Sequence, residues 1–295
     1  EKIGYGKCTI AVFIQTEKMR SRNKIGIMQG RLLPPVSNTI QAFPEKGWQK
    51  EFPLARKLGL DCIEFIFDGD NFSSHPLMTA EGLREIERLE QENEVGVLSV
   101  CADYFMAHPL HQGSPEERLA QVKILQDLIR NCAKLDISNI IIPCVDNSRL
   151  QIGTDMMEFK LKLGECLPVA EDCNINLVLE TDLGPDAFTN LMRDINHEYL
   201  KINYDTGNSA SLGYEPTIEF ESYGRWITDV HIKDRVYEGT TVPLGEGDVD
   251  FPQVFSLLRR MSYNGIFILQ TARKQPGSEQ ETIKGYLDFI GKYLP

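Results

Sequence analysis

The sequence predicts an α/β protein built as one (β/α)₈ barrel, and three observations lead to this fold class. The chain has 295 residues, and a complete barrel of this kind needs about 250. From Lys24 onward, short strand-like runs alternate with amphipathic helical patterns, which is typical of βα units around a parallel sheet. No G-x-G-x-x-G loop follows the first strand, although an open doubly wound sheet would normally carry one. We therefore expect the closed barrel.

Eight segments have the length and composition of buried β-strands. Each is short and dominated by apolar and β-branched side chains. In a barrel these strands follow one another around the axis, and a helix joins each strand to the next. The predicted strands are residues 24–29, 61–67, 95–101, 139–143, 176–181, 200–205, 226–233 and 266–270.

Capping residues mark the starts of helices between these strands. Ser114 begins a capping box that has Pro115 at the first helical position and Glu117 at the third. Ser278 begins a second box of the same kind, and Asp250 is placed to cap another helix. Apolar residues recur at helical spacing behind each start, so three amphipathic helices are expected there.

The pattern assigns residues 24–295 to a single catalytic barrel domain. One barrel accounts for this length, so no further domain is expected. Residues 1–23 stand outside the βα pattern. Because Met19 offers a later start for translation, we expect this segment to be an N-terminal extension or a cloning remnant.

The composition argues against several partners. The net charge of −12 does not fit a nucleic-acid surface, which needs clustered Lys and Arg. No apolar run approaches the roughly 20 residues that span a bilayer, so no membrane partner is expected. The seven cysteines form no C-x-x-C pair, which indicates reduced thiols in the cytoplasm. We expect a soluble, cytoplasmic protein.

Polar side chains that are able to bind a metal close the last four predicted strands. Chemistry in such barrels collects at the C-terminal strand ends, and successive strands place these side chains around one ring. Two carboxylates, an imidazole and an amide oxygen suit Mn²⁺, Mg²⁺ or Co²⁺ better than a structural Zn²⁺. We therefore expect a divalent metal at the barrel mouth, with Zn²⁺ as a further option. The four residues are Glu180, Asp205, His231 and Gln270.

Each of these residues, taken alone, has an ordinary structural interpretation. A single acidic residue at a strand end is more often a helix cap, and a single histidine on a strand is more often a core residue. Their joint placement on successive strands reverses this judgement. Burying Glu180, Asp205 and His231 together without a cation would cost several kcal/mol.

Six short motifs together span almost the whole chain after residue 24. They are residues 24–31 (KIGIMQGR), 63–65 (IEF), 177–180 (LVLE), 204–208 (YDTGN), 229–234 (DVHIKD) and 243–251 (PLGEGDVDF). In this order they resemble the xylose-isomerase-like TIM-barrel superfamily, and in particular its sugar phosphate isomerase/epimerase branch. The resemblance implies a metal-dependent isomerase or epimerase of carbohydrate metabolism that acts on a small sugar or sugar phosphate.

The resemblance implies that Glu180, Asp205 and His231 are metal ligands. The superfamily usually has a fourth ligand, a glutamate, at the end of strand eight, and this chain has Gln270 there. An amide oxygen is still able to coordinate a hard cation, so we expect Gln270 to be a ligand. Binding should be weaker, because the number of charged ligands tunes the affinity.

Gln270 affects the expected chemistry more than it affects metal binding. Ketose epimerases of the superfamily use the glutamates of strands five and eight as bases on opposite faces of one carbon, and Gln270 cannot accept that proton. Glu180 remains able to take a proton next to a polarised carbonyl and so form an enediolate. An aldose–ketose isomerisation needs only one face, so Gln270 favours an isomerase. Asn208 also favours an isomerase, because the epimerases of the superfamily tend to have histidine at this position.

Other residues around the strand ends are expected to serve the substrate. Lys233 points to the same side as His231 and should stabilise enediolate charge or hold a phosphate. Arg31 and Arg273 follow the first and last strands, where they would grip a phosphate or carboxylate or form ion pairs at the rim. A solvated loop position is an equal interpretation for His108. The expected substrate-binding residues are Arg31, Glu64, His108, Asn208 and Arg273.

Three other functions are weighed against this one. A non-catalytic sugar-binding barrel and a metal-dependent dehydratase of a polyol derivative both stay open, and in the former Gln270 would mark lost activity. The superfamily also contains nucleases that nick abasic DNA. These need more histidine ligands and a basic face, whereas this chain has five histidines and a net charge of −12. Barrels of this kind often pair, so a homo-oligomer also stays open.

Overall fold

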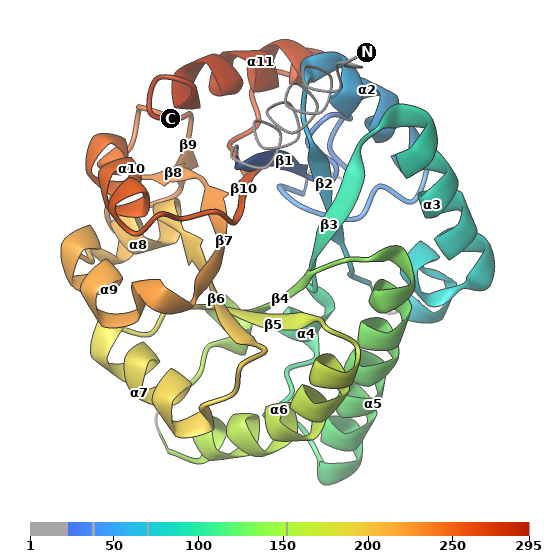
Figure 1. Cartoon of the computed structure of the whole chain (residues 1–295), viewed down its shortest axis with the longest axis vertical. Coiled ribbons are helices and arrows are strands. Elements are labelled where there is room, and N and C mark those ends of the chain that lie inside the picture. Colours follow the sequence, from blue (N-terminus) through green and yellow to red (C-terminus); the bar gives the residue numbers. More distant parts are fainter. Residues whose placement is uncertain (1–22, 37–38, 70, 152, 295) are drawn as a thin grey trace, which may run out of the picture.

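The strands form one closed barrel, as predicted. The structure, a computed structural model, describes residues 23–36, 39–69, 71–151 and 153–294. Eight parallel strands close in the order β1-β10-β7-β6-β5-β4-β3-β2, and helices surround them (Figure 1). Apart from Asn23, the expected N-terminal segment 1–23 lies outside the described residues. The (β/α)₈ fold class is confirmed.

The boundaries of the barrel strands agree with the predicted ones to within one residue at each end. Apolar side chains dominate both faces of these strands, because the sheet is covered by helices outside and packed inside, although several buried polar residues interrupt them. A short antiparallel pair, β8 (Asp234–Arg235) and β9 (Thr241–Val242), lies after β7 and was not predicted. The barrel strands are β1 (Lys24–Met28), β2 (Cys62–Ile66), β3 (Gly96–Cys101), β4 (Asn139–Cys144), β5 (Asn176–Thr181), β6 (Leu200–Asp205), β7 (Ile227–Ile232) and β10 (Ile266–Leu269).

The outer layer is a ring of helices, each following a strand in the chain (Figure 1). Among the described residues, no helix combines the length and the hydropathy that a membrane span requires. The α-helices are α2 (Glu51–Leu58), α3 (Ala80–Asn93), α4 (Tyr104–Ala107), α5 (Pro115–Cys132), α6 (Thr154–Asp172), α7 (Pro185–Ile195), α8 (Thr206–Leu212), α9 (Pro216–Tyr223), α10 (Phe251–Arg260) and α11 (Glu279–Ile290). Short 3₁₀ turns cover Trp48–Lys50, Phe72–Ser74, Pro76–Met78, Ala133–Leu135, Asp146–Ser148 and Gly224–Trp226.

Two of the three predicted helix caps form. The Ser114 side chain accepts a hydrogen bond from the Glu117 N–H, and Glu117 accepts one from the Ser114 N–H in return. Asp250 caps α10. The box expected at Ser278 is wrong: α11 starts there, but the Ser278 hydroxyl donates to the Gln275 carbonyl instead. The backbone of Ser278 (φ −107°, ψ 16°) lies outside the extended region that an N-cap normally adopts.

The loop after β1 is held by a buried carboxylate. The side chain of Glu51 accepts hydrogen bonds from the N–H groups of Gly30, at 2.8 and 2.9 Å, and of Leu32, at 3.3 Å. Arg273 donates to the carbonyls of Gly30, Leu33 and Ile40 from the other side. These contacts fix the loop backbone where it leaves the barrel and turns over the strand ends.

Stability should therefore depend on pH through Glu51. Burial raises the pKa of this carboxyl from 4.5 to about 7, so between these values the folded chain holds a proton that the unfolded chain has lost. Its contribution to stability falls as the pH rises through this window, by up to about 3 kcal/mol. In urea unfolding at a series of pH values from 4.5 to 8, the Glu51→Gln variant should become more stable relative to the wild type as the pH rises. A difference that stays constant with pH would contradict this expectation.

Candidate active site

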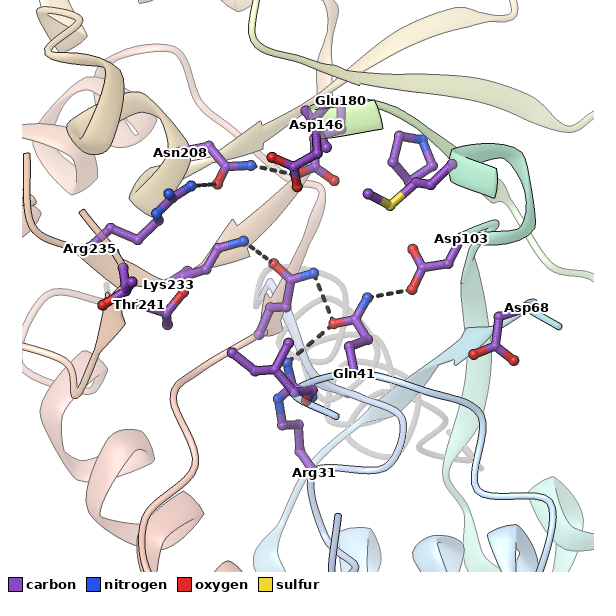
Figure 2. A pocket seen from close by; sticks show the side chains of 16 residues that line it. Arg31, Gln41, Asp68, Asp103, Asp146, Glu180, Asn208, Lys233, Arg235 and Thr241 are labelled. Atoms are coloured by element: carbon purple, nitrogen blue, oxygen red, sulfur yellow. Dashed lines mark hydrogen bonds between the residues drawn. The ribbon is translucent and has the colours of Figure 1, made fainter. Parts of the chain in front are cut away.

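A cavity of about 530 Å³ opens at the C-terminal ends of the strands (Figure 2). Its floor is made by residues that end β5, β7 and β10, and its walls come from the loops after β1 to β4 and from the β8–β9 pair. This is the face at which barrel enzymes place their chemistry. Lys233 and Gln270, both predicted site residues, lie in its lining together with Glu180.

Three of the predicted metal ligands converge at the base of this cavity. His231 lies opposite Asp205 in the β6–β7 register. Its Nδ1 atom is 3.7 Å from Glu180 Oε2 and 3.9 Å from Asp205 Oδ2. All three side chains are buried, and one ligand atom of each lies within 4.8 Å of the others. Strand alternation and the β6–β7 register therefore bring these side chains to one point.

Glu64 fixes the direction of the His231 ring. Its carboxylate lies 2.8 Å from His231 Nε2 and also accepts a hydrogen bond from the Ser99 hydroxyl. Burial alone would lower the pKa of His231, but the Glu64 carboxylate outweighs it, helped by Glu180, and raises this pKa to about 10. Among the described residues, His231 Nδ1 has no hydrogen-bond partner. The ring therefore turns a nitrogen that makes no hydrogen bond towards the two carboxylates.

This arrangement fits a divalent cation. Ligand atoms about 2.1 Å from one ion stand roughly 3 to 3.8 Å apart, which is close to the separations of Nδ1 from the two carboxylates. Those separations are too long for direct hydrogen bonds. The unpartnered Nδ1 is a second sign that a group is expected there, since buried polar atoms are nearly always bonded. A histidine whose other nitrogen is held by a carboxylate is a recurring metal-binding arrangement.

Gln270 is placed differently from the other three predicted ligands. Its Oε1 accepts a hydrogen bond of 2.7 Å from Lys233 Nζ, which lies equally close to Asp205 Oδ2. Its amide nitrogen donates to Gln41 Oε1 at 3.2 Å. Burial would raise the pKa of Asp205, but the Lys233 ammonium outweighs it and lowers this pKa. Lys233 therefore provides the positive charge closest to Asp205, and it occupies the oxygen of Gln270.

Glu180 has the environment of a general base. Burial and, next, the Asp205 carboxylate raise the pKa of Glu180 to about 7, where a side chain exchanges protons efficiently near neutral pH. Asn208 Nδ2 donates to Glu180 Oε1 at 2.7 Å and so orients the carboxylate. Asn208 is held in turn by Arg235, whose Nη1 lies 2.9 Å from its amide oxygen (Figure 2).

The predicted substrate-binding residues divide into two groups. Arg31 and Asn208 line the cavity. Glu64 lies beneath it, fully buried against His231. His108 is half-buried with its ring 4.6 Å from that of Tyr104, outside the lining. Arg273 also lies outside the lining, because its guanidinium donates to carbonyls of the loop after β1.

The polar cavity residues that were not predicted include Gln41, Asp103 and Arg235. Gln41 links Arg31, Gln270 and Asp103 by hydrogen bonds across the mouth (Figure 2). Asp103 follows β3 by two residues, so the rule that predicted the other site residues would have found it. Arg235 directly follows the motif of residues 229–234, so its position just after a strand could have identified it as well. No sequence signal marks Gln41, because its position depends on how the loop folds.

Comparisons with known proteins agree with this geometry. The model of the family described as "Xylose isomerase-like TIM barrel" matches residues 52–292. L-ribulose-5-phosphate 3-epimerase UlaE of Salmonella heidelberg is 24% identical over 233 residues, which are 76% of this chain and 81% of that protein. D-psicose 3-epimerase of Clostridium cellulolyticum H10, solved with D-tagatose, superposes with a TM-score of 0.72 at 16% identity, over 92% of this chain and 99% of that one. The IOLI protein, solved with a zinc atom, gives a TM-score of 0.73 at 15% identity and the same two coverages.

Proposed function

Because this chain belongs to the xylose isomerase-like TIM barrel family, we propose that it is a metal-dependent isomerase or epimerase of a small sugar or sugar phosphate. The convergence of Glu180, Asp205 and His231 Nδ1 at the base of the cavity is the observation that carries this proposal. The similarity to UlaE and the common fold with D-psicose 3-epimerase support the same reaction class. The IOLI protein, which shares the fold, was solved with a zinc atom, and this supports a metal in the present chain.

The proposed cation is Mn²⁺, Mg²⁺, Co²⁺ or Zn²⁺, held by Glu180, Asp205 and His231. When bound, such an ion polarises the substrate carbonyl as a Lewis acid. The carbonyl oxygen of Gln270, which Lys233 occupies, would become a fourth ligand only if the lysine released it. In this structure Lys233 neutralises part of the charge of Asp205 and holds the oxygen of Gln270.

The proton transfer is assigned to Glu180. Its carboxylate takes the proton from the carbon next to the carbonyl, and the electron pair of that C–H bond forms the double bond of an enediolate. Lys233 offsets the negative charge that develops on oxygen. The proton on Glu180 exchanges with water, the hydroxyl proton of the intermediate moves to the former carbonyl oxygen, and Glu180 then protonates the neighbouring carbon, which completes an aldose–ketose isomerisation on one face. The Gln270 amide cannot deliver a proton to the opposite face, so inversion at one carbon would need another acid.

Metal binding and proton exchange provide the test. Adding Mn²⁺ to metal-free protein should raise the melting temperature, with about 2.7 kcal/mol of added stability at 100 times the dissociation constant. The Mn²⁺ protein should then incorporate solvent deuterium next to the carbonyl of a ketopentose or ketohexose, as NMR in D₂O would show. Sugar binding without exchange would favour the non-catalytic sugar-binding barrel. Loss of water from the sugar would identify a dehydratase.

A further inference from the structure

The cavity carries a charge pattern that bears on the substrate class. Resting on the function proposed above, we propose that the site takes an uncharged sugar and discriminates against its phosphate ester. The carboxylates in the described lining outnumber the cations. The carboxylates are Asp68, Asp103, Asp146 and Glu180, and the cations are Arg31, Lys233 and Arg235.

The three cations are already bonded to the protein. Lys233 contacts Asp205 and Gln270. Arg31 donates to the backbone carbonyls of Thr271 and Ile40 and to the side chain of Gln41. A phosphate is normally bound by a guanidinium that presents two parallel N–H donors. In Arg31, each of the three nitrogens already donates a hydrogen bond to the protein.

Arg235 is committed in the same way. Its Nε and one terminal nitrogen both donate to the Gly239 carbonyl, at 3.1 and 2.7 Å, and the other terminal nitrogen donates to Asn208. This guanidinium therefore braces the β8–β9 turn and orients Asn208 towards Glu180. A phosphate would have to break these bonds in order to receive a bidentate contact.

The wall across the cavity from Lys233 and Arg235 is acidic (Figure 2). Asp103 and Asp68 lie on this side, and each is half-buried. Asp103 accepts from Gln41 and the Cys101 thiol, and Asp68 accepts from the Phe43 N–H, so both carboxylates keep acceptor capacity. A carboxylate accepts up to about four hydrogen bonds and so suits hydroxyl donors. It repels a phosphate that carries one to two negative charges.

Asp146 adds a third acceptor at the rim. Its backbone has a positive φ of 50°, an uncommon conformation for a residue other than glycine, although aspartate tolerates it. Its carboxylate makes no hydrogen bond within the described part of the chain, and it lines the cavity. Asp146, Asp103 and Asp68 thus offer acceptors to hydroxyl groups remote from the carbonyl that Glu180 and the cation would handle.

The test compares matched pairs, L-ribulose with L-ribulose 5-phosphate and D-tagatose with its 6-phosphate. Full-length protein loaded with Mn²⁺ is placed in D₂O, and deuterium incorporation is measured at limiting sugar concentration. The free sugars should exchange at least about tenfold faster than their phosphates. The Asp146→Asn variant should narrow this ratio, because it removes one like charge. Glu281→Gln, the same change on the exposed face of α11, should leave the ratio as it is.

The outcomes separate this inference from the function on which it rests. Phosphates that exchange as fast as free sugars, or faster, would overturn the inference and leave the proposed isomerase or epimerase standing. A ratio that Asp146→Asn leaves unchanged would remove Asp146 from the discrimination. If neither member of any pair exchanges, the proposed function fails and the inference fails with it.

Discussion

Replacing Glu180 by glutamine should abolish solvent deuterium incorporation into the substrate, with a loss of at least about 100-fold. The amide has nearly the same shape and is still able to accept the Asn208 hydrogen bond, but it cannot take a proton. Rates from NMR in D₂O, measured at saturating Mn²⁺, separate this loss from weakened metal binding.

The fold should survive this substitution. Glu180 is buried close to Asp205, and burial raises its pKa, so the carboxylate costs stability once it is ionised. Urea unfolding at pH 8 should therefore show the glutamine variant to be at least as stable as the wild type in the absence of metal. Exchange that persists in a folded, Mn²⁺-saturated variant would exclude Glu180 as the base.

Replacing Glu64 by glutamine should weaken Mn²⁺ binding by about 10- to 100-fold. The Glu64 carboxylate accepts from His231 Nε2 and so leaves Nδ1 for the cation. An amide is able to donate its own N–H to Nε2 instead, which would move the ring proton to Nδ1 and block the ligand atom. Calorimetric titration with Mn²⁺ measures this effect directly.

Ser99→Ala provides the matched control for Glu64. It removes only the hydroxyl bond to the second oxygen of Glu64, so its effect on Mn²⁺ affinity should be smaller. A contrary result would be a Glu64→Gln variant that binds Mn²⁺ normally but has a raised KM for sugar. That outcome would favour the substrate-binding role expected from the sequence.

The fold was predictable because its signals are local. Strand composition, helix caps and the alternation of βα units each depend on a few neighbouring residues, and together they allow only a small set of topologies. The convergence of three predicted ligands was predictable for the same reason, because parallel strands bring their C-terminal ends to one rim. Glu180, Asp205 and His231 needed no knowledge of any loop.

The rest of the site depends on contacts between residues far apart in the chain. Gln41 reaches Asp103 and Gln270 only because Glu51 and Arg273 fix the loop after β1. The sequence showed that Arg273 follows a strand, but it did not show that the guanidinium would donate its hydrogen bonds to backbone carbonyls. Gln270 was predicted as a ligand from its position, and nothing in the sequence indicated that Lys233 would hold its oxygen.

The contact between Lys233 and Asp205 bears on how the enzyme is assembled in time. Because the Lys233 ammonium already lies beside this carboxylate, the acidic residues are partly neutralised while the chain folds. Folding should therefore not require a bound metal ion. In the proposed metal-dependent enzyme, cation binding would then be a late and reversible event at a site that is already built. Such a protein would tolerate periods of metal scarcity without being degraded as an unfolded chain.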